Sequence, residues 1–135
     1  MGTRCLTVFV EENNDEICVL YRQMDGYPDG HGKELADFLL DMKITDGLTF
    51  SSSKTANGMS CLAAQVIAYF KTCAGGFYLH PAKTRDCWEQ YIYTIKLSNG
   101  EGLNVQCLDV YNNKILFDGS PEFMIDWLHD NYSTE

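Results

Sequence analysis

The segment from Leu20 to Gly32, LYRQMDGYPDGHG, holds the densest group of reactive side chains in the chain. Asp25, Asp29 and His31 lie within seven residues of one another, and carboxylates with an imidazole can perform acid–base catalysis or bind a divalent cation. The spacing does not match a calcium-binding loop, in which DxDxDG precedes a distant Glu. Asp in a Gly-rich loop commonly bonds its own backbone. We therefore expect a defined turn here, with no metal, no cofactor and no catalytic residue.

Turn chemistry does not require every polar side chain of this segment. Loops between rigid elements are where binding residues gather, so we take the unexplained side chains, with Asp25, as ligand-binding candidates. Neighbouring residues at the end of a strand point to opposite faces, so either Arg22 or Gln23 should point into the fold. We expect the arginine to pair with Asp25 or Asp29 and hold the loop. The unexplained residues are Arg22, Gln23, Tyr27 and His31.

A candidate anion site lies at the start of a predicted helix near residue 58. Asn57, Gly58 and Ser60 precede or open this helix, whose first N–H groups favour phosphate. Lysine and arginine side chains of the basic middle third would add charge, and aromatic rings would offer faces for a base. NGMS lacks the glycines and lysine of a P-loop, and an ordinary capped helix with solvated lysines is the simpler explanation. The cations are Lys54, Lys83 and Arg85, and the rings are those of Tyr27, Tyr78 and Trp88.

Cysteine chemistry is the third alternative. Cys61 lies near the start of the same predicted helix, where the helix dipole favours a thiolate, and His31 or His80 would have to serve as its base. A cysteine in an apolar helix is more simply a core residue. The six cysteines show no CxxC spacing, so we expect reduced thiols without a zinc site.

Composition and charge limit the class of protein. A chain of 135 residues, 45% of them hydrophobic, can bury one core, so we expect a single domain over residues 1–135. The net charge of −9 is uneven, with −6 on residues 1–50, +3 on residues 51–100 and −6 on residues 101–135. This acidity argues against binding to duplex nucleic acid. With no targeting or apolar spanning segment, we expect a cytoplasmic protein without membrane contact.

Hydrophobic periodicity predicts the elements that position these residues. An antiparallel hairpin precedes two helices, four strands and a final helix, in the order ββααββββα. This order favours an α+β domain with two layers, in which two to three helices cover an antiparallel sheet of about five to six strands. Asp29 should cap the first helix and Ser120 the last, and the polar connection 46–58 is a candidate mobile loop. The strands are expected at 3–10, 17–24, 77–80, 91–97, 103–110 and 114–117, and the helices at 32–43, 59–73 and from 120 onward.

Five segments resemble a group of short uncharacterised proteins of tailed phages and prophages. They are MGTR, YRQMDGYPDGHG, NGMSCLAAQ, YIYTI and FDGSPEF, and together they span nearly the whole chain. The resemblance implies a small accessory protein that acts in the cytoplasm of a host cell. This class of proteins includes those that counter host defence. It implies no activity, ligand or catalytic residue.

We expect a small non-enzymatic binding protein that forms a homo-oligomer. In the first hypothesis it sequesters a small phosphorylated or nucleotide-like ligand, as a counter-defence protein would. In the second it is an acidic inhibitor that mimics nucleic acid and binds a host protein. A small hydrolase that depends on Cys61 or on the loop carboxylates is the third.

Overall fold

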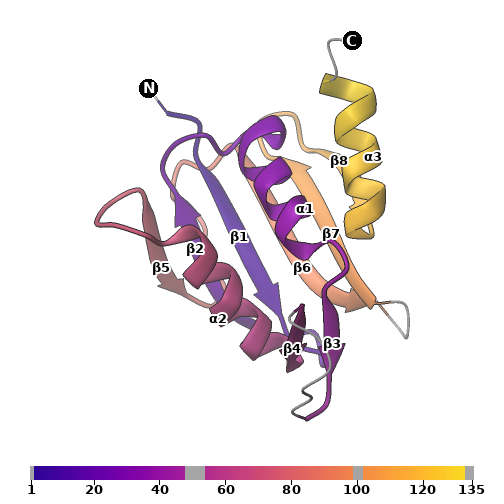
Figure 1. Ribbon diagram of the computed structural model, residues 1–135. Coiled ribbons are helices and arrows are strands. Elements are labelled where there is room, and N and C mark those ends of the chain that lie inside the picture. Colours follow the sequence, from indigo (N-terminus) through magenta and orange to yellow (C-terminus); the bar gives the residue numbers. More distant parts are fainter. Residues whose placement is uncertain (1, 48–53, 99–101, 133–135) are drawn as a thin grey trace.

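The computed structural model describes residues 2–47, 54–98 and 102–132. These residues form a six-stranded sheet, a small two-stranded sheet and three α-helices (Figure 1). The order in the large sheet is β5-β2-β1-β6-β7-β8. Its strands are β1 (Cys5–Val10), β2 (Glu16–Arg22), β5 (Phe77–Pro81), β6 (Tyr91–Ser98), β7 (Gly102–Asp109) and β8 (Lys114–Gly119). The small sheet pairs β3 (Lys43–Thr45) with β4 (Thr55–Asn57), and the helices are α1 (Lys33–Leu39), α2 (Gly58–Phe70) and α3 (Pro121–Tyr132).

The α+β class is confirmed, and the large sheet is mixed. Neighbouring strands run antiparallel except for β1 and β6, which are parallel. A parallel pair needs a long connection, and the chain between β1 and β6 includes α1 and α2. Periodicity identifies strands but not their partners, so an entirely antiparallel sheet was expected and this pair was missed.

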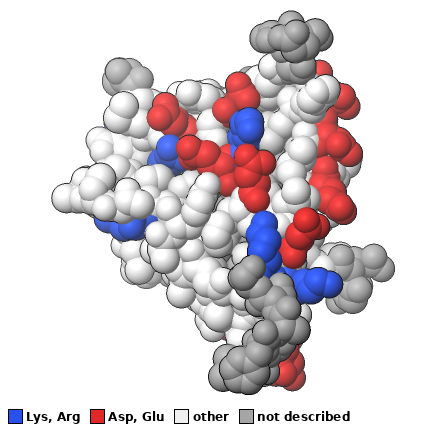
Figure 2. Space-filling model, in the orientation of Figure 1, with Lys and Arg blue, Asp and Glu red and all other residues white. Residues whose placement is uncertain are grey.

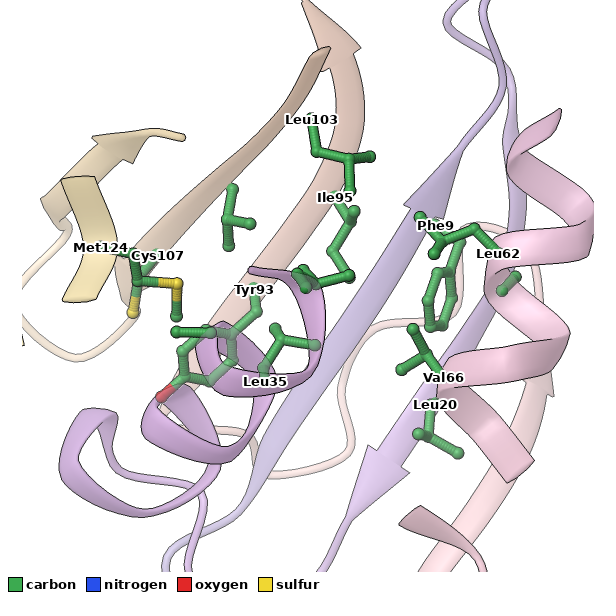
Figure 3. Packing of buried hydrophobic residues seen from close by; sticks show 14 of the residues in the cluster. Phe9, Leu20, Leu35, Leu62, Val66, Tyr93, Ile95, Leu103, Cys107 and Met124 are labelled. Atoms are coloured by element: carbon green, nitrogen blue, oxygen red, sulfur yellow. The ribbon is translucent and has the colours of Figure 1, made fainter. Parts of the chain in front are cut away.

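The three helices cover one face of the large sheet (Figure 1). Side chains of a strand alternate between faces, and in β1 both sets are buried, so each face of this strand is covered. Toward the helices, buried side chains of the central strands pack against all three of them. Figure 3 shows this packing for Phe9, Leu20, Tyr93, Ile95, Leu103 and Cys107 of the sheet and Leu35, Leu62, Val66 and Met124 of the helices.

The opposite face of the sheet has a smaller apolar cluster of its own. Leu6, Val8 and Val10 of β1 pack there with Val19 of β2. The connection between β5 and β6 adds Cys87 to this cluster. The connection therefore covers the central strands where no helix does.

The start of α1 differs from the prediction. Residues Pro28–Gly32 form one π-helical turn, η1, that runs directly into α1, and Tyr27 occupies the position before it. No side chain caps either start, so the expected cap by Asp29 is wrong. The reason is local: Gly30 and Gly32 donate their N–H groups to the carbonyl of Tyr27, and this backbone turn takes the place of a side-chain cap.

The start of α3 is as predicted. The N–H of Phe123 donates to Oγ of Ser120 at 3.1 Å, and Pro121 is the first helical residue. All six cysteines are free thiols. In the connection 46–58, residues 55–57 form β4, while residues 48–53, about half of the expected mobile loop, lie outside the described residues. Across the described ranges, the helices are too short or too polar to cross a bilayer.

Candidate functional site

The loop between β2 and η1 follows a backbone path that its sequence dictates. Asp25 has a left-handed backbone with φ 64°, and its carbonyl accepts the N–H of His31 at 2.8 Å. Gly26 donates its N–H to Thr3 and lies so close to β1 that an added Cβ would come within 2.8 Å of the Cβ of Cys5. Its own carbonyl accepts the hydroxyl of Tyr93 at 2.8 Å. The loop is thus fixed to the sheet, as the density of Gly, Pro and Asp indicated.

His31 is fully buried beneath this loop. Its Nδ1 lies 3.2 Å from Nη1 of Arg22, and its Nε2 lies 2.7 Å from Oγ1 of Thr7. Since a guanidinium only donates, Nδ1 must accept, and Nε2–H therefore donates to Thr7. The imidazole also stacks on Phe70 with ring centroids 4.7 Å apart. Burial and, to a smaller extent, the charge of Arg22 together lower the pKa of His31 to about 3, so the side chain is neutral.

Arg22 connects this buried histidine to the surface. Its Nη1 donates to Oε1 of Glu34 at 2.6 Å, so the expected partners Asp25 and Asp29 are wrong. The guanidinium lies 4.9 Å from the ring centre of Phe77 and 5.7 Å from that of Phe70, and only 12% of the side chain is exposed. Of the two strand-end neighbours, one of which was expected to point into the fold, Arg22 is the one that points toward the helix layer. No described residue bonds to its Nε or Nη2.

The other loop candidates lie around this pair and are exposed. Gln23 uses its backbone N–H to bond the carbonyl of Gly76. The hydroxyl of Tyr27 lies 3.4 Å from Oδ1 of Asp25, as a long hydrogen bond within the loop. Arg22 and His31 are therefore in contact, whereas Gln23, Asp25 and Tyr27 present their side chains to solvent.

The candidates for the anion site are held by separate partners. Oδ1 of Asn57 accepts the N–H of Gly47 at 2.7 Å, and Ser60 is exposed on the first turn of α2. Arg85 forms an ion pair with Glu16 at 2.7 Å, and the N–H of Lys83 bonds the same carboxylate. Burial tends to raise the pKa of Glu16, but these hydrogen bonds and charges lower it overall. In the parts of the chain that the structure describes, no hydrogen bond or ion pair joins Asn57 or Ser60 to Lys83 or Arg85.

Among the described residues, no hydrogen bond or ion pair joins a cysteine to a histidine. The thiol of Cys61 donates to Oε1 of Gln65 at 3.2 Å. His31 contacts Phe70, which lies nine residues further along α2, or about 14 Å along a helix. A search of the described side chains also finds no group of three His, Cys, Asp or Glu able to hold a metal ion.

A groove between α1 and α3 lies beside the loop, and sequence reasoning missed it. Its cavity of about 260 Å³ has an apolar part made by Ile125, Leu128 and Tyr132 of α3. The polar residues that line it are Asp29, Lys33, Asp37 and His129. Only Asp29 belongs to a segment that the sequence had singled out. The groove depends on how two helices distant in sequence pack together, which no local pattern reveals.

Carboxylates dominate the surface around this groove. Figure 2 shows them gathered over α1 and along α3 on the helix-covered face. Lys33 pairs with Asp37 at 3.4 Å, whereas no described residue bonds or pairs with the carboxylate of Asp29. On α3 the exposed acids follow a helical spacing of four residues, at Glu122, Asp126 and Asp130. The groove therefore combines an apolar lining with a negative rim.

Comparison of the chain with known proteins gives no match to any family model, to any curated protein or to any solved structure.

Proposed function

We propose that this is a non-enzymatic binding protein that engages a positively charged segment of a partner protein through the groove between α1 and α3. The observation that carries the proposal is the composition of the groove, in which an apolar wall of Ile125, Leu128 and Tyr132 lies beside the carboxylate of Asp29. Apolar contact supplies affinity at an interface, and charge complementarity supplies orientation and speed of association.

The charge of the whole molecule supports the same proposal. The net charge is −9, and acidic side chains surround the groove on the helix-covered face (Figure 2). Such a surface attracts basic partners over a Debye length, about 8 Å at physiological salt, and repels nucleic acid. A host enzyme with a basic nucleic-acid channel is the kind of partner that fits.

The proposal is tested with a short peptide of alternating lysine and leucine as the probe. Calorimetry should detect binding to the wild-type protein and none with a peptide of alternating glutamate and leucine. The double variant Asp29→Asn, Asp37→Asn should weaken binding about fivefold, since a pair of exposed charges contributes roughly 1 kcal/mol.

The matched control is the double variant Glu122→Gln, Asp126→Asn. It removes the same charge from exposed positions of α3 that do not line the groove. Because these carboxylates belong to the same acidic face, its affinity should fall, but less than that of the groove variant. Equal weakening by both double variants would mean that net charge alone attracts the peptide, and the groove would then have no specific role.

Capture of a small phosphorylated or nucleotide-like ligand is a second candidate function. It is favoured by Arg22, whose Nε and Nη2 have no partner among the described residues and whose plane lies near the rings of Phe70 and Phe77. Glu34 opposes it, because this carboxylate already neutralises the guanidinium. A nucleotide at about 100 times its Kd should stabilise the fold by roughly 2.7 kcal/mol in a thermal-shift panel. A panel of nucleotides and pyrophosphate without any shift would count against it.

A further inference from the structure

The connection between β5 and β6 presents the most exposed large apolar side chain among the described residues. Trp88 is 79% exposed. Tryptophan is the residue most enriched among binding hot spots, and its burial in a complex removes a large apolar area from water. An indole held in solvent therefore marks a surface to examine for a partner.

The fold anchors this connection on both sides of Trp88. Thr84 bonds the carbonyl of Pro81 through its N–H and its hydroxyl, and Arg85 pairs with Glu16 at 2.7 Å. Beyond the tryptophan, the N–H of Gln90 donates to Arg4 at 2.8 Å at the start of β1. Cys87, the residue before Trp88, packs into the apolar cluster on this face of the sheet. The indole is thus presented from a fixed backbone.

The backbone at this point takes a conformation that bulky residues avoid. Trp88 has φ 61° and Asp86 has φ 66°, both in the left-handed region. The anchors on either side hold these angles. Their effect is that Cys87 points into the apolar cluster while Trp88 points to solvent.

A pocket of about 290 Å³ lies beside the indole, lined by Asp86, Trp88, Glu89 and Val110. Glu89 is only 8% exposed, and its Oε1 accepts the N–H of Cys87 at 2.7 Å. No described residue bonds to its Oε2. Burial raises the pKa of Cys87, and the negative charges of Glu89 and Asp86 on either side of it raise this pKa further. None of the described residues that line it is a lysine or an arginine.

We propose that this pocket binds an arginine side chain of a partner protein, with the guanidinium over the indole of Trp88 and beside the carboxylates of Asp86 and Glu89. A cation over an indole is attracted by the ring, and carboxylates supply acceptors for its N–H groups. Arginine fits better than lysine, because the guanidinium is planar, stacks on aromatic faces and is weakly hydrated. The site lies on the β5–β6 connection and uses no residue of the groove, so it stands independently of the function proposed above.

The test follows the indole N–H signals of the labelled full-length protein during titration with acetyl-arginine amide. The signal of Trp88 should shift, while that of Trp127, which packs against Phe117 at 5.0 Å, serves as the internal reference. Acetyl-citrulline amide has nearly the same shape without the charge and should give a much smaller shift. Trp88→Ala, followed through the amide signal of Val110, should weaken binding about two- to fivefold.

Two further variants complete the test. Glu89→Gln keeps an acceptor for the N–H of Cys87 and removes the charge, so it should weaken binding without unfolding the protein. Tyr111→Ala removes an aromatic ring that is 69% exposed but does not line the pocket, and its affinity should equal that of the wild type.

Three results would overturn the proposal. The first is an equal response to arginine and citrulline, and the second is unchanged affinity after both Trp88→Ala and Glu89→Gln. The third is a Trp88 signal that moves with protein concentration in the absence of the probe, since a second copy of the chain would then cover the indole. The groove variant Asp29→Asn, Asp37→Asn should respond as the wild type does, which separates this site from the groove.

Discussion

His31 is a neutral structural side chain, placed between the hydroxyl of Thr7 and the guanidinium of Arg22. Both ring nitrogens are used, and aromatic rings of Phe70 and Tyr93 lie within 5 Å of its own. The sequence identified Arg22 and His31, together with Gln23 and Tyr27, as side chains that turn chemistry leaves unexplained. The sequence could not show that Arg22 and His31 contact each other. Their remaining partners, Glu34 and Thr7, come from other elements. Conversely, Asp29 looked like a cap and instead lines a groove.

The burial of neutral His31 predicts a pH dependence of stability. Its pKa falls from 6.5 to about 3 on folding, so below pH 6.5 the unfolded chain binds a proton that the folded protein does not. Stability is therefore retained above pH 6.5 and lost as the pH falls from 6.5 toward 3, at up to about 1.4 kcal/mol per pH unit. Urea unfolding at pH 7.5 and pH 5.0 should show a loss of roughly 2 kcal/mol from this group.

The variant His31→Gln isolates this contribution from that of the carboxylates. Glutamine can accept from Arg22 and donate to Thr7, but it does not titrate. The loss between the two pH values should therefore be smaller in the variant than in the wild type. An identical loss in both proteins would show that His31 takes up its proton in the folded state as well.

The elements hold the groove in place through their ends. The side chain of Ser120 caps the start of α3, which packs beside α1. α1 continues from η1, where a Cβ added to Gly32 would lie 3.3 Å from the ring of Tyr93. The cap of α3 was predictable because Ser, Pro and Glu at successive positions form a local signal. The π-helical turn was not, since it depends on backbone bonds to Tyr27 within a Gly-rich stretch that also suits a simple turn.

Removal of the cap should weaken the helix that lines the groove. Ser120→Ala leaves the N–H of Phe123 without its partner and should lower the free energy of unfolding by about 1 kcal/mol. Ser120→Asp supplies another acceptor and should restore most of this loss. Chemical denaturation of the three proteins gives the comparison, and equal stability of the alanine and aspartate variants would argue against the cap.

For the molecule as a whole, the sequence shows that negative charge is concentrated in the first and last parts of the chain. The fold brings acidic side chains of these parts together on the helix-covered face (Figure 2). The acidic first and last thirds of the chain supply α1 and α3, which lie side by side on one face. Strand order is the part that the sequence left open, because the parallel pairing of β1 with β6 joins residues about 85 positions apart. The expected homo-oligomer stays a prediction, which light scattering of the purified protein would test.

Binding of the lysine–leucine peptide should depend on salt. Salt screens the attraction between the exposed carboxylates and the lysines of the peptide. Raising the ionic strength from about 0.1 M to about 1 M shortens the Debye length from roughly 10 Å to 3 Å, so the complex should weaken. The apolar contact with Ile125, Leu128 and Tyr132 should leave measurable affinity at high salt. Tyr132→Ala should reduce this residual part, and affinity that is independent of salt would contradict the electrostatic role of the acidic face.

Mapping where the lysine–leucine peptide touches the protein shows whether the groove between α1 and α3 is the binding surface. Backbone amide shifts of the labelled protein should change most at Asp29, Lys33, Asp37, Ile125 and Tyr132 during the titration. They should change little along β8, which lies at one edge of the sheet. Shifts spread evenly over the acidic surface, or absent from α1 and α3, would contradict the account.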